Sequence, residues 1–299
     1  MALARLPQDA IALEEPVRRR WGDALVQFVR RKPLGAAGAA IVVVMALTAL
    51  LAGVVAPYDP LETDYSSMFA APSWQHWLGT DSFGRDQLSR IIFGSRTALL
   101  VGFGASFVGA TTGLLIGAAS AYFGGRTDMV VQRVMDVLLS FPLIILALAV
   151  VAILGTGVLK VIVAITIPMV PRAARVCRAT ALAVRESPYV DAARASGFGH
   201  ARIILRHIVP NVIPPYLIVL TAFVGQAILL EASLSYLGLG VQEPTAAWGL
   251  MLQGGAEEYA ESAPWIPIFP GLAISLAVFA FNLFGDSLRD VLDPKLRTV

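Results

Sequence analysis

The residues that could carry out catalysis or bind a metal ion are few and widely separated in this 299-residue sequence. None of the lysines follows a glycine, so a P-loop of the form G-x-x-x-x-G-K-[ST] is absent from the sequence. The histidines His76, His200 and His207 and the single Cys177 lack the spacing of a metal site, and no G-x-S-x-G or zincin pattern occurs. We therefore expect a chain that is not an enzyme and binds no cofactor of its own.

Three charged side chains, Glu231, Arg85 and Asp86, could act through ion pairs or hydrogen bonds. Glu231 follows a hydrophobic stretch, where a carboxylate exposed to lipid would cost about 2.5 to 3.5 kcal/mol. It should face protein or water, either in a hydrogen-bonding or gating role or in contact with a substrate. Arg85 and Asp86, in "LGTDSFGRDQLSR", could pair with each other at the outer end of the spans, or this loop could simply pack on its own protein.

The composition indicates that these residues are positioned by a membrane protein. Hydrophobic residues make up 57% of the chain and charged residues only 15%, where soluble domains average about 25% charged. The net charge of +2 is too small to imply a nucleic acid partner. Membrane lipid is the expected surrounding.

Six apolar runs are candidate membrane spans, which need about 20 residues of helix each. They cover residues 34–56, 98–123, 137–154, 158–170, 212–230 and 266–284. The third contains Pro142, and the fourth is short unless its helix continues past Pro168 and Pro171, which neighbouring helices can tolerate. The pattern predicts an all-α, polytopic protein with six transmembrane helices.

Basic residues near span ends stay on the cytoplasmic side, and their distribution predicts that both termini are cytoplasmic. Of the 23 Lys and Arg residues, 19 lie in the segments 1–33, 124–136, 171–210 and 289–299. The first span is longer than the apolar part of a signal peptide, about 7 to 15 residues, and "GVVAPYDP" lacks an A-x-A site, so we expect an uncleaved anchor. The expected organisation is a cytoplasmic segment (1–33), a first span (34–56), an extracytoplasmic loop (57–97), a core (98–288) with a cytoplasmic loop (171–211) and an outer loop (236–265), and a cytoplasmic tail (289–299).

The cytoplasmic stretch "ESPYVDAARASGFGHARIILRHIVP" has the start and stop signals of two short helices joined by a glycine elbow. Ser187 can cap the first helix, Pro188 suits its first position, and Gly197 can take the left-handed conformation that ends it. Pro210 should stop or kink the second helix before the fifth span. Periodicity alone also fits an amphipathic connector whose arginines contact anionic lipid.

The spacing within this stretch resembles the EAA loop of permease subunits of binding-protein-dependent ABC importers. Asp191 is followed by two alanines, by Gly197 six positions later and by Pro210 thirteen positions after that. The sequence departs from the family pattern in having Asp191 instead of glutamate, and His207 and Val209 where Ile and Leu are commonest. The resemblance assigns ATPase coupling to Ser187, Pro188, Tyr189, Val190, Asp191, Ala192, Ala193, Ala195, Gly197, Phe198, Gly199 and Pro210.

Three further stretches narrow the resemblance to the oligopeptide/dipeptide-type permeases, specifically the second of their two paired subunits. They are "HWLGTDSFGRDQLSRIIFGSRTALLVG", "EASLSYLGLGVQEPTAAWGLML" and "FNLFGDSLRDVLDPKLR". Together with the loop, the resemblance covers nearly the whole chain from about Pro33 onward.

The resemblance implies a type I ABC importer permease fold with cytoplasmic coupling helices, in a bacterial inner membrane. Its implied partners are a homologous permease subunit, an extracytoplasmic substrate-binding protein and two cytoplasmic ATPase subunits, which would hold the ATP and Mg. The implied cargo is a short peptide, with nickel chelates, glutathione and oligosaccharides as alternatives. Glu231, Arg85 and Asp86 are the candidate gate or pathway residues.

Two other classes of function stay open at this point. An ion-coupled secondary transporter is disfavoured, because the span interiors are nearly free of charge and no internal repeat is visible. The second is a membrane-anchored scaffold without a transport role.

Overall fold

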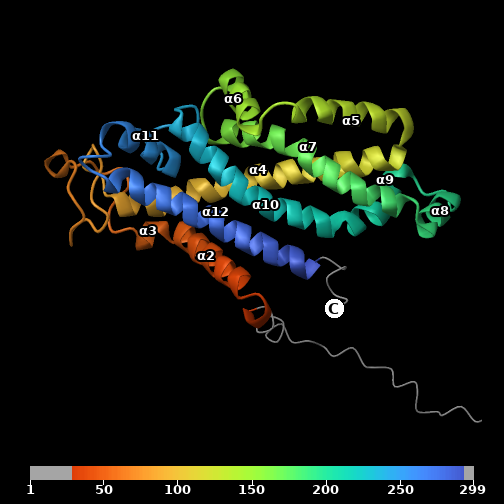
Figure 1. Ribbon diagram of the computed structural model, residues 1–299, viewed down its shortest axis with the longest axis horizontal. Coiled ribbons are helices and arrows are strands. Elements are labelled where there is room, and N and C mark those ends of the chain that lie inside the picture. The colour runs from red at the N-terminus through yellow and green to blue at the C-terminus, as the bar shows by residue number, and fades with distance from the viewer. Residues whose placement is uncertain (1–28, 293–299) are drawn as a thin grey trace, which may run out of the picture.

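Long apolar helices lie side by side along the molecule in the computed structural model, which describes residues 29–292 (Figure 1). In chain order the elements are α2 (Pro33–Leu50), α3 (Ala52–Val55), the 3-10 turn η2 (Tyr65–Ser67), α4 (Gln87–Phe123), α5 (Gly125–Leu139), α6 (Leu143–Leu154), α7 (Val158–Arg185), α8 (Pro188–Ala195), α9 (His200–Ile203), the π-helical turn η3 (Ile204–Ile208), α10 (Val209–Tyr236), α11 (Trp248–Glu258) and α12 (Trp265–Leu292). No β-strand occurs within the described range, so the predicted all-α class is confirmed there.

The two ends of the helix bundle carry different parts of the chain (Figure 1). We call the end that carries α8 the loop end, and the opposite end, with residues 57–86 and α11, the outer end. Residues 1–28 of the predicted cytoplasmic segment and 293–299 of the predicted tail lie outside the described range.

Within residues 29–292, four helices are long and apolar enough to cross a membrane. They are α2, α4, the continuous helix from His200 to Tyr236, and α12. The pair α5 and α6 is a fifth candidate if it forms one span, although the two helices meet at 91°. The predicted fourth span lies in the first half of α7, which continues past Pro168 and Pro171 to Arg185 and carries four arginines in its second half. The count of six spans stays a prediction.

The candidate third span, 137–154, is not a single straight helix, because the chain bends within it. α5 ends at Leu139, and α6 begins after Pro142, whose backbone is extended with ψ 135°. A proline has no N–H to donate to the preceding turn, so the helix ends before it and restarts after it. The expected cytoplasmic connector 124–136 is largely helical, because α5 starts at Gly125, directly after the turn at Gly124 with φ 63°.

The helices α4 and α7 pack closely along a glycine seam made of Gly109, Gly113 and Gly117. A Cβ atom at Gly113 would lie 2.4 Å from the Cβ of Ala173, and one at Gly117 would lie 2.4 Å from the carbonyl oxygen of Ala174. Real Cβ atoms do not approach this closely, so only glycine allows the two backbones to pack at this distance. Such small-residue spacing drives helix association in lipid, where apolar side chains gain little by contact.

The helix α2 packs against α12 in a similar way. A Cβ atom at Gly38 would lie 2.7 Å from the carbonyl oxygen of Ala280, and Lys32, the residue before α2, forms an ion pair with Asp290 near the end of α12. The first and last predicted spans are therefore neighbours, although they are far apart in sequence.

At the outer end, α11 lies within the predicted outer loop 236–265, and its Trp248 donates a hydrogen bond from Nε1 to the carbonyl of Ile91 at 2.9 Å.

Candidate functional site

The short helix α8 at the loop end begins and ends where the sequence predicts. Ser187 has the extended backbone of an N-cap, φ −79° and ψ 140°, although its side chain makes no capping hydrogen bond, and Pro188 takes the first helical position. Gly197 has φ +74°, a conformation that side chains with a Cβ rarely adopt. The N–H of Phe198 then donates to the carbonyl of Ala193 at 3.2 Å, which satisfies the helix end.

The second predicted short helix is not separate from the fifth span, so that part of the prediction is wrong. α9 continues through η3 into α10, and together they form a 37-residue helix from His200 to Tyr236. Pro210 lies in the first turn of α10 and neither ends the helix nor separates it from the span. The π-helical turn η3 directly precedes this proline, and the N–H of Val209 donates to the carbonyl of Ile204 there.

The predicted loop residues divide between a buried and an exposed face of α8. Val190 and Ala193 are buried against the rest of the bundle. The exposed residues of the predicted set in α8 are Pro188, Tyr189, Asp191, Ala192 and Ala195. The structure settles the partner of Asp191, which accepts a hydrogen bond from Arg194 Nη1 at 2.9 Å, one turn further along.

The remaining predicted loop residues connect α8 to the start of the long helix. Phe198 stacks on His207, with ring centres 6.0 Å apart, and Gly199 is the N-cap residue of α9. The hydroxyl of Tyr189 donates to the carbonyl of His207 at 3.4 Å and accepts from Nδ2 of Asn211 at 3.1 Å. The loop residues therefore form one folded unit with the beginning of α10.

Arg85 and Asp86 do not pair with each other, and the loop that carries them packs on its own protein, the second of the two possibilities that the sequence left open. Asp86 caps α4 by accepting hydrogen bonds from the N–H and hydroxyl of Ser89, at 2.8 and 2.7 Å, and its other oxygen lies 3.0 Å from Nδ1 of His76. Because this carboxylate is engaged in capping, α4 starts at Gln87, inside the predicted loop 57–97. The guanidinium of Arg85 turns toward other carboxylates.

An outer ion cluster, made of Asp81, Arg85, Arg90 and Glu243, joins three parts of the outer end. Arg85 donates from Nε to Asp81 at 2.7 Å and, through both terminal nitrogens, to Glu243 at 2.9 and 3.2 Å. Arg90, which is 1% exposed, donates to Glu243 at 3.3 Å and to the carbonyl of Pro60 at 3.2 Å. The cluster therefore ties residues 57–86 and the beginning of α4 to the segment between α10 and α11.

The carboxylates of this cluster keep Arg85 charged. Burial alone would lower the pKa of its guanidinium, but the hydrogen bond to Glu243 and the charges of Asp81 and Glu243 outweigh burial and raise the pKa above its usual value. The sequence prediction did not include Glu243, since a glutamate in a polar "QEPT" loop has no local pattern that points to Arg85, 158 residues away.

Glu231 faces protein, as predicted, and belongs to a different network. Its side chain is buried and accepts a hydrogen bond from the hydroxyl of Ser235 at 2.7 Å, while the same hydroxyl oxygen accepts from the N–H of Val241 at 3.1 Å. This chain of bonds fixes the end of α10 to the segment that carries Glu243.

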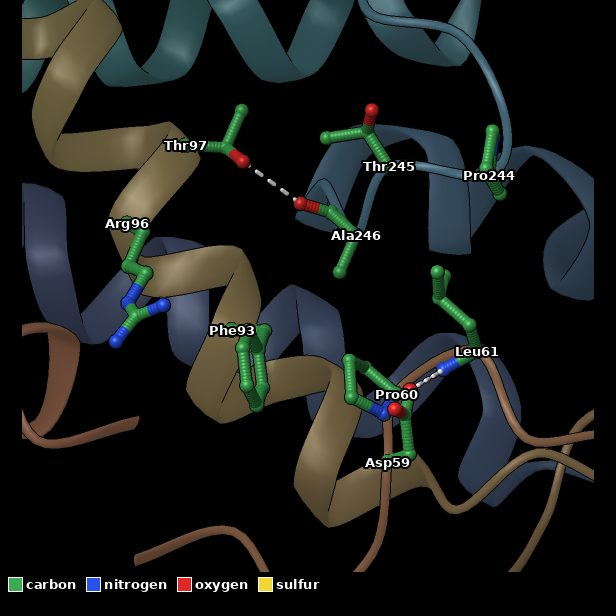
Figure 2. A pocket seen from close by; sticks show the side chains of 9 residues that line it. All are labelled: Asp59, Pro60, Leu61, Phe93, Arg96, Thr97, Pro244, Thr245 and Ala246. Atoms are coloured by element: carbon green, nitrogen blue, oxygen red, sulfur yellow. Dashed lines mark hydrogen bonds between the residues drawn. The ribbon is translucent and has the colours of Figure 1, made fainter. Parts of the chain in front are cut away.

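A pocket of about 440 Å³ opens at the outer end, between residues 59–61, α4 and residues 244–246 (Figure 2). The hydroxyl of Thr97 donates to the carbonyl of Ala246 at 2.8 Å on one side of it. Arg96 donates to the carbonyls of Ala49 and Leu50 at 2.6 and 3.2 Å, which satisfies the end of α2. Among residues 29–292, no group of three or more His, Cys, Asp or Glu side chains could hold a metal ion.

Comparisons with known proteins agree with this arrangement. Residues 109–298 match the family "Binding-protein-dependent transport system inner membrane component", and residues 19–72 match the "N-terminal TM domain of oligopeptide transport permease C". Proteins named "Glutathione transport system permease protein GsiD" are similar over 292 residues, 97% of this chain and 96% of each relative. The identity is 41% for those of Escherichia coli O6:K15:H31 and Shigella boydii serotype 4, and 43% for that of Shigella flexneri serotype 5b. The chain belongs to the family of binding-protein-dependent ABC importer permeases, of the peptide/oligopeptide type.

Family membership establishes several of the properties expected from the sequence. The permease is a multi-pass protein of the inner membrane with the type I permease fold, and it is a non-catalytic component of its transporter. Permeases of this family work with a paired permease subunit, ATPase subunits and a substrate-binding protein. The glycine seam was missed at the sequence level although its signal is present, because Gly109, Gly113 and Gly117 follow a G-x-x-x-G spacing in an apolar run.

Proposed function

We propose that this permease and a homologous paired subunit form the pathway through which short peptides enter the cell, with tripeptides such as glutathione as the leading cargo. The observation that supports this proposal is the 41% identity, over 97% of the chain, with permeases named for glutathione transport. Glutathione is a tripeptide, so this cargo lies within the short-peptide class that the sequence motifs favour. An extracytoplasmic binding protein delivers the peptide to the outer end.

The proposed ATPase-docking surface is the exposed face of α8 with the elbow that follows it, residues 187–199. Its support is the division of α8 into two faces, because Val190 and Ala193 fix the helix to the bundle while Tyr189, Asp191 and Ala192 remain available to a partner. Two ATPase subunits bind the ATP and Mg, and this chain binds neither.

Transport proceeds by alternating access in this proposal. Closure of the ATPases moves α8, which is joined by the elbow to the start of the long helix, and from His200 to Tyr236 this helix runs into the fifth span without a break. At the outer end, the cluster that joins Arg85 to Glu243 and the buried Glu231 hold the segment after α10 in place, which makes them the candidates for gating. Asp86 acts as a helix cap in this scheme and has no gating role.

The test is uptake by the complete transporter, with both permeases, both ATPases and the binding protein, reconstituted into lipid vesicles. We expect ATP-dependent accumulation of labelled glutathione and of other tripeptides, and competition between them. A dipeptide, a nickel chelate and an oligosaccharide serve as comparison cargoes. Uptake of one of the last two without any peptide uptake would contradict the proposed cargo, and uptake driven by a proton or sodium gradient without ATP would contradict the ATP-driven mechanism.

A further inference from the structure

The last turn of α4 at the loop end is held by side chains from three later elements. Arg185 at the end of α7 donates from Nη1 to the carbonyl of Ala121 at 3.0 Å. The guanidinium carbon of Arg194, on α8, lies 5.3 Å from the centre of the Tyr122 ring. Nδ1 of His200, at the start of α9, lies 2.8 Å from the Tyr122 hydroxyl oxygen. This turn is therefore a meeting point for α7, α8 and the long helix.

Tyr122 is the residue of this turn that touches both sides of the glycine elbow. Its side chain is 6% exposed, its ring lies beneath a cation from α8, and its hydroxyl bonds to the first residue of α9. A guanidinium over an aromatic face is attracted by the ring, by about 0.5 to 1 kcal/mol at partly exposed sites. Phe123 adds a second aromatic contact to His200, with ring centres 5.6 Å apart. We call Tyr122, Arg194 and His200 the Tyr122 cluster.

The elbow makes such a contact necessary if α8 is to move as a rigid part of the permease. Between the end of α8 at Ala195 and the start of α9 at His200, the chain passes through Gly197, whose backbone is the most permissive available. Only two residues of α8 are buried, Val190 and Ala193, and neither is large. A short helix on a glycine joint with so small a buried face needs additional contacts to pass a displacement on.

We infer that Tyr122 is a positioning residue that holds α8 and the start of the long helix in a fixed relation to α4, so that a displacement of α8 moves both spans together. This inference rests on the proposed docking of the ATPase on α8. Tyr122 and His200 lie outside residues 187–199, so variants at these two positions test transmission without changing the proposed docking surface, whereas Arg194 belongs to both and is not varied. A residue that served folding alone would affect assembly and coupling equally.

The experiment measures three quantities in the complete transporter: co-purification of the ATPases, ATP hydrolysis stimulated by loaded binding protein, and peptide molecules transported per ATP. In Tyr122→Phe, which removes the hydroxyl and keeps the ring, we expect normal co-purification. We expect transport per ATP to fall about fivefold, the factor that corresponds to one hydrogen bond of typical net strength. His200→Ala should lower the ratio at least as far, because it removes the ring contact with Phe123 as well as the hydrogen bond, and the double variant should be no worse than His200→Ala alone. His200→Asn, whose amide can stand near the position of Nδ1, should restore most of the ratio.

The matched control is Tyr216→Phe. The Tyr216 hydroxyl also forms a hydrogen bond between α10 and α4, with Thr111 at 3.0 Å, but it lies outside the Tyr122 cluster. Transport per ATP should therefore stay at the wild-type value. An unchanged ratio in Tyr122→Phe, or an equal fall in Tyr216→Phe, would overturn the role of Tyr122 while leaving the proposed docking intact. If the wild-type permease failed to co-purify with the ATPases, both the docking proposal and this inference would be overturned.

Discussion

Replacing Gly113 by alanine tests whether the glycine seam holds the core of the permease together. The added Cβ would lie 2.4 Å from the Cβ of Ala173 and 2.8 Å from the backbone nitrogen of Ala174. Carbon atoms in good contact are about 3.5 to 4.0 Å apart, so α4 and α7 would have to separate by about 1 Å. Because the nearest atoms belong to backbone and to a Cβ, no side-chain rotation can relieve the clash.

The expected cost is the difference between two effects. Overpacking of a well-packed interior lowers the free energy of unfolding by about 1 to 3 kcal/mol. Alanine in place of glycine stabilises a helix by about 0.5 to 1 kcal/mol, which offsets part of that loss. We expect a net loss of about 1 to 2 kcal/mol in the free energy of unfolding, and a larger loss for Gly113→Leu. The control is Gly104→Ala on the same helix, where the new Cβ would meet the flexible end of Ile162 at 3.2 Å. That variant should be neutral or slightly stabilised.

The measurement is unfolding of the purified permease by titration of a denaturing detergent into a mild one, followed by tryptophan fluorescence. The midpoint for Gly113→Ala should fall clearly below those of the wild type and Gly104→Ala. If the two alanine variants unfold at the same point, the seam does not limit the approach of α4 and α7, and the packing argument is wrong.

The other predictions concern the loop and the outer end. Gly197→Pro should leave membrane insertion intact and lower ATPase co-purification, because proline fixes φ near −65° where the chain needs +74°. The control is Gly199→Ala, since Gly199 has φ −64° and open space around the new Cβ. Equal yields of co-purified ATPase from the two variants would contradict the role of the elbow. Asp191→Ala should change the free energy of unfolding by less than about 1 kcal/mol in the same detergent titration, because the ion pair of Asp191 with Arg194 is exposed. A larger loss would show that this ion pair is needed for folding. Glu243→Gln should lower the free energy of unfolding by about 1 to 2 kcal/mol, after allowing for the partial exposure of Glu243, because it leaves the buried Arg90 with a weaker partner. This loss should exceed that of Asp191→Ala. A smaller loss would show that the outer ion cluster does not stabilise the outer end.

Local patterns gave the helical class and the start and end of α8. Pro188 and Gly197 act through their own backbone preferences, so a window of a few residues contains the necessary information. Pro142 likewise predicts a break in the helix from local sequence alone. The structure shows a 91° bend between α5 and α6 there, and the direction of that bend depends on which residues pack on each side. Pro210 gave the opposite outcome, because the π-helical turn before it let the helix continue.

The charged residues of the outer end show the limit of local reasoning most clearly. The neighbouring Arg85 and Asp86 invited a pairing that the structure does not contain, since the N-cap of α4 engages the aspartate and leaves the arginine to Glu243. Which of several carboxylates an arginine meets depends on how distant segments are placed. The partner of Asp191, by contrast, lies one helical turn away at Arg194, within reach of a local rule.

The sequence by itself determined that the chain is a membrane permease, because hydrophobic length, basic residues at span ends and four ordered motifs are properties that each segment carries alone. The tertiary structure decided that α9 is continuous with the fifth span, that Tyr122 meets both sides of the elbow, and that Arg85 meets Glu243. The contacts of Tyr122 and Arg85 join residues between 72 and 158 positions apart. Their geometry follows from how closely α4, α7 and α10 pack, which depends on all three helices at once.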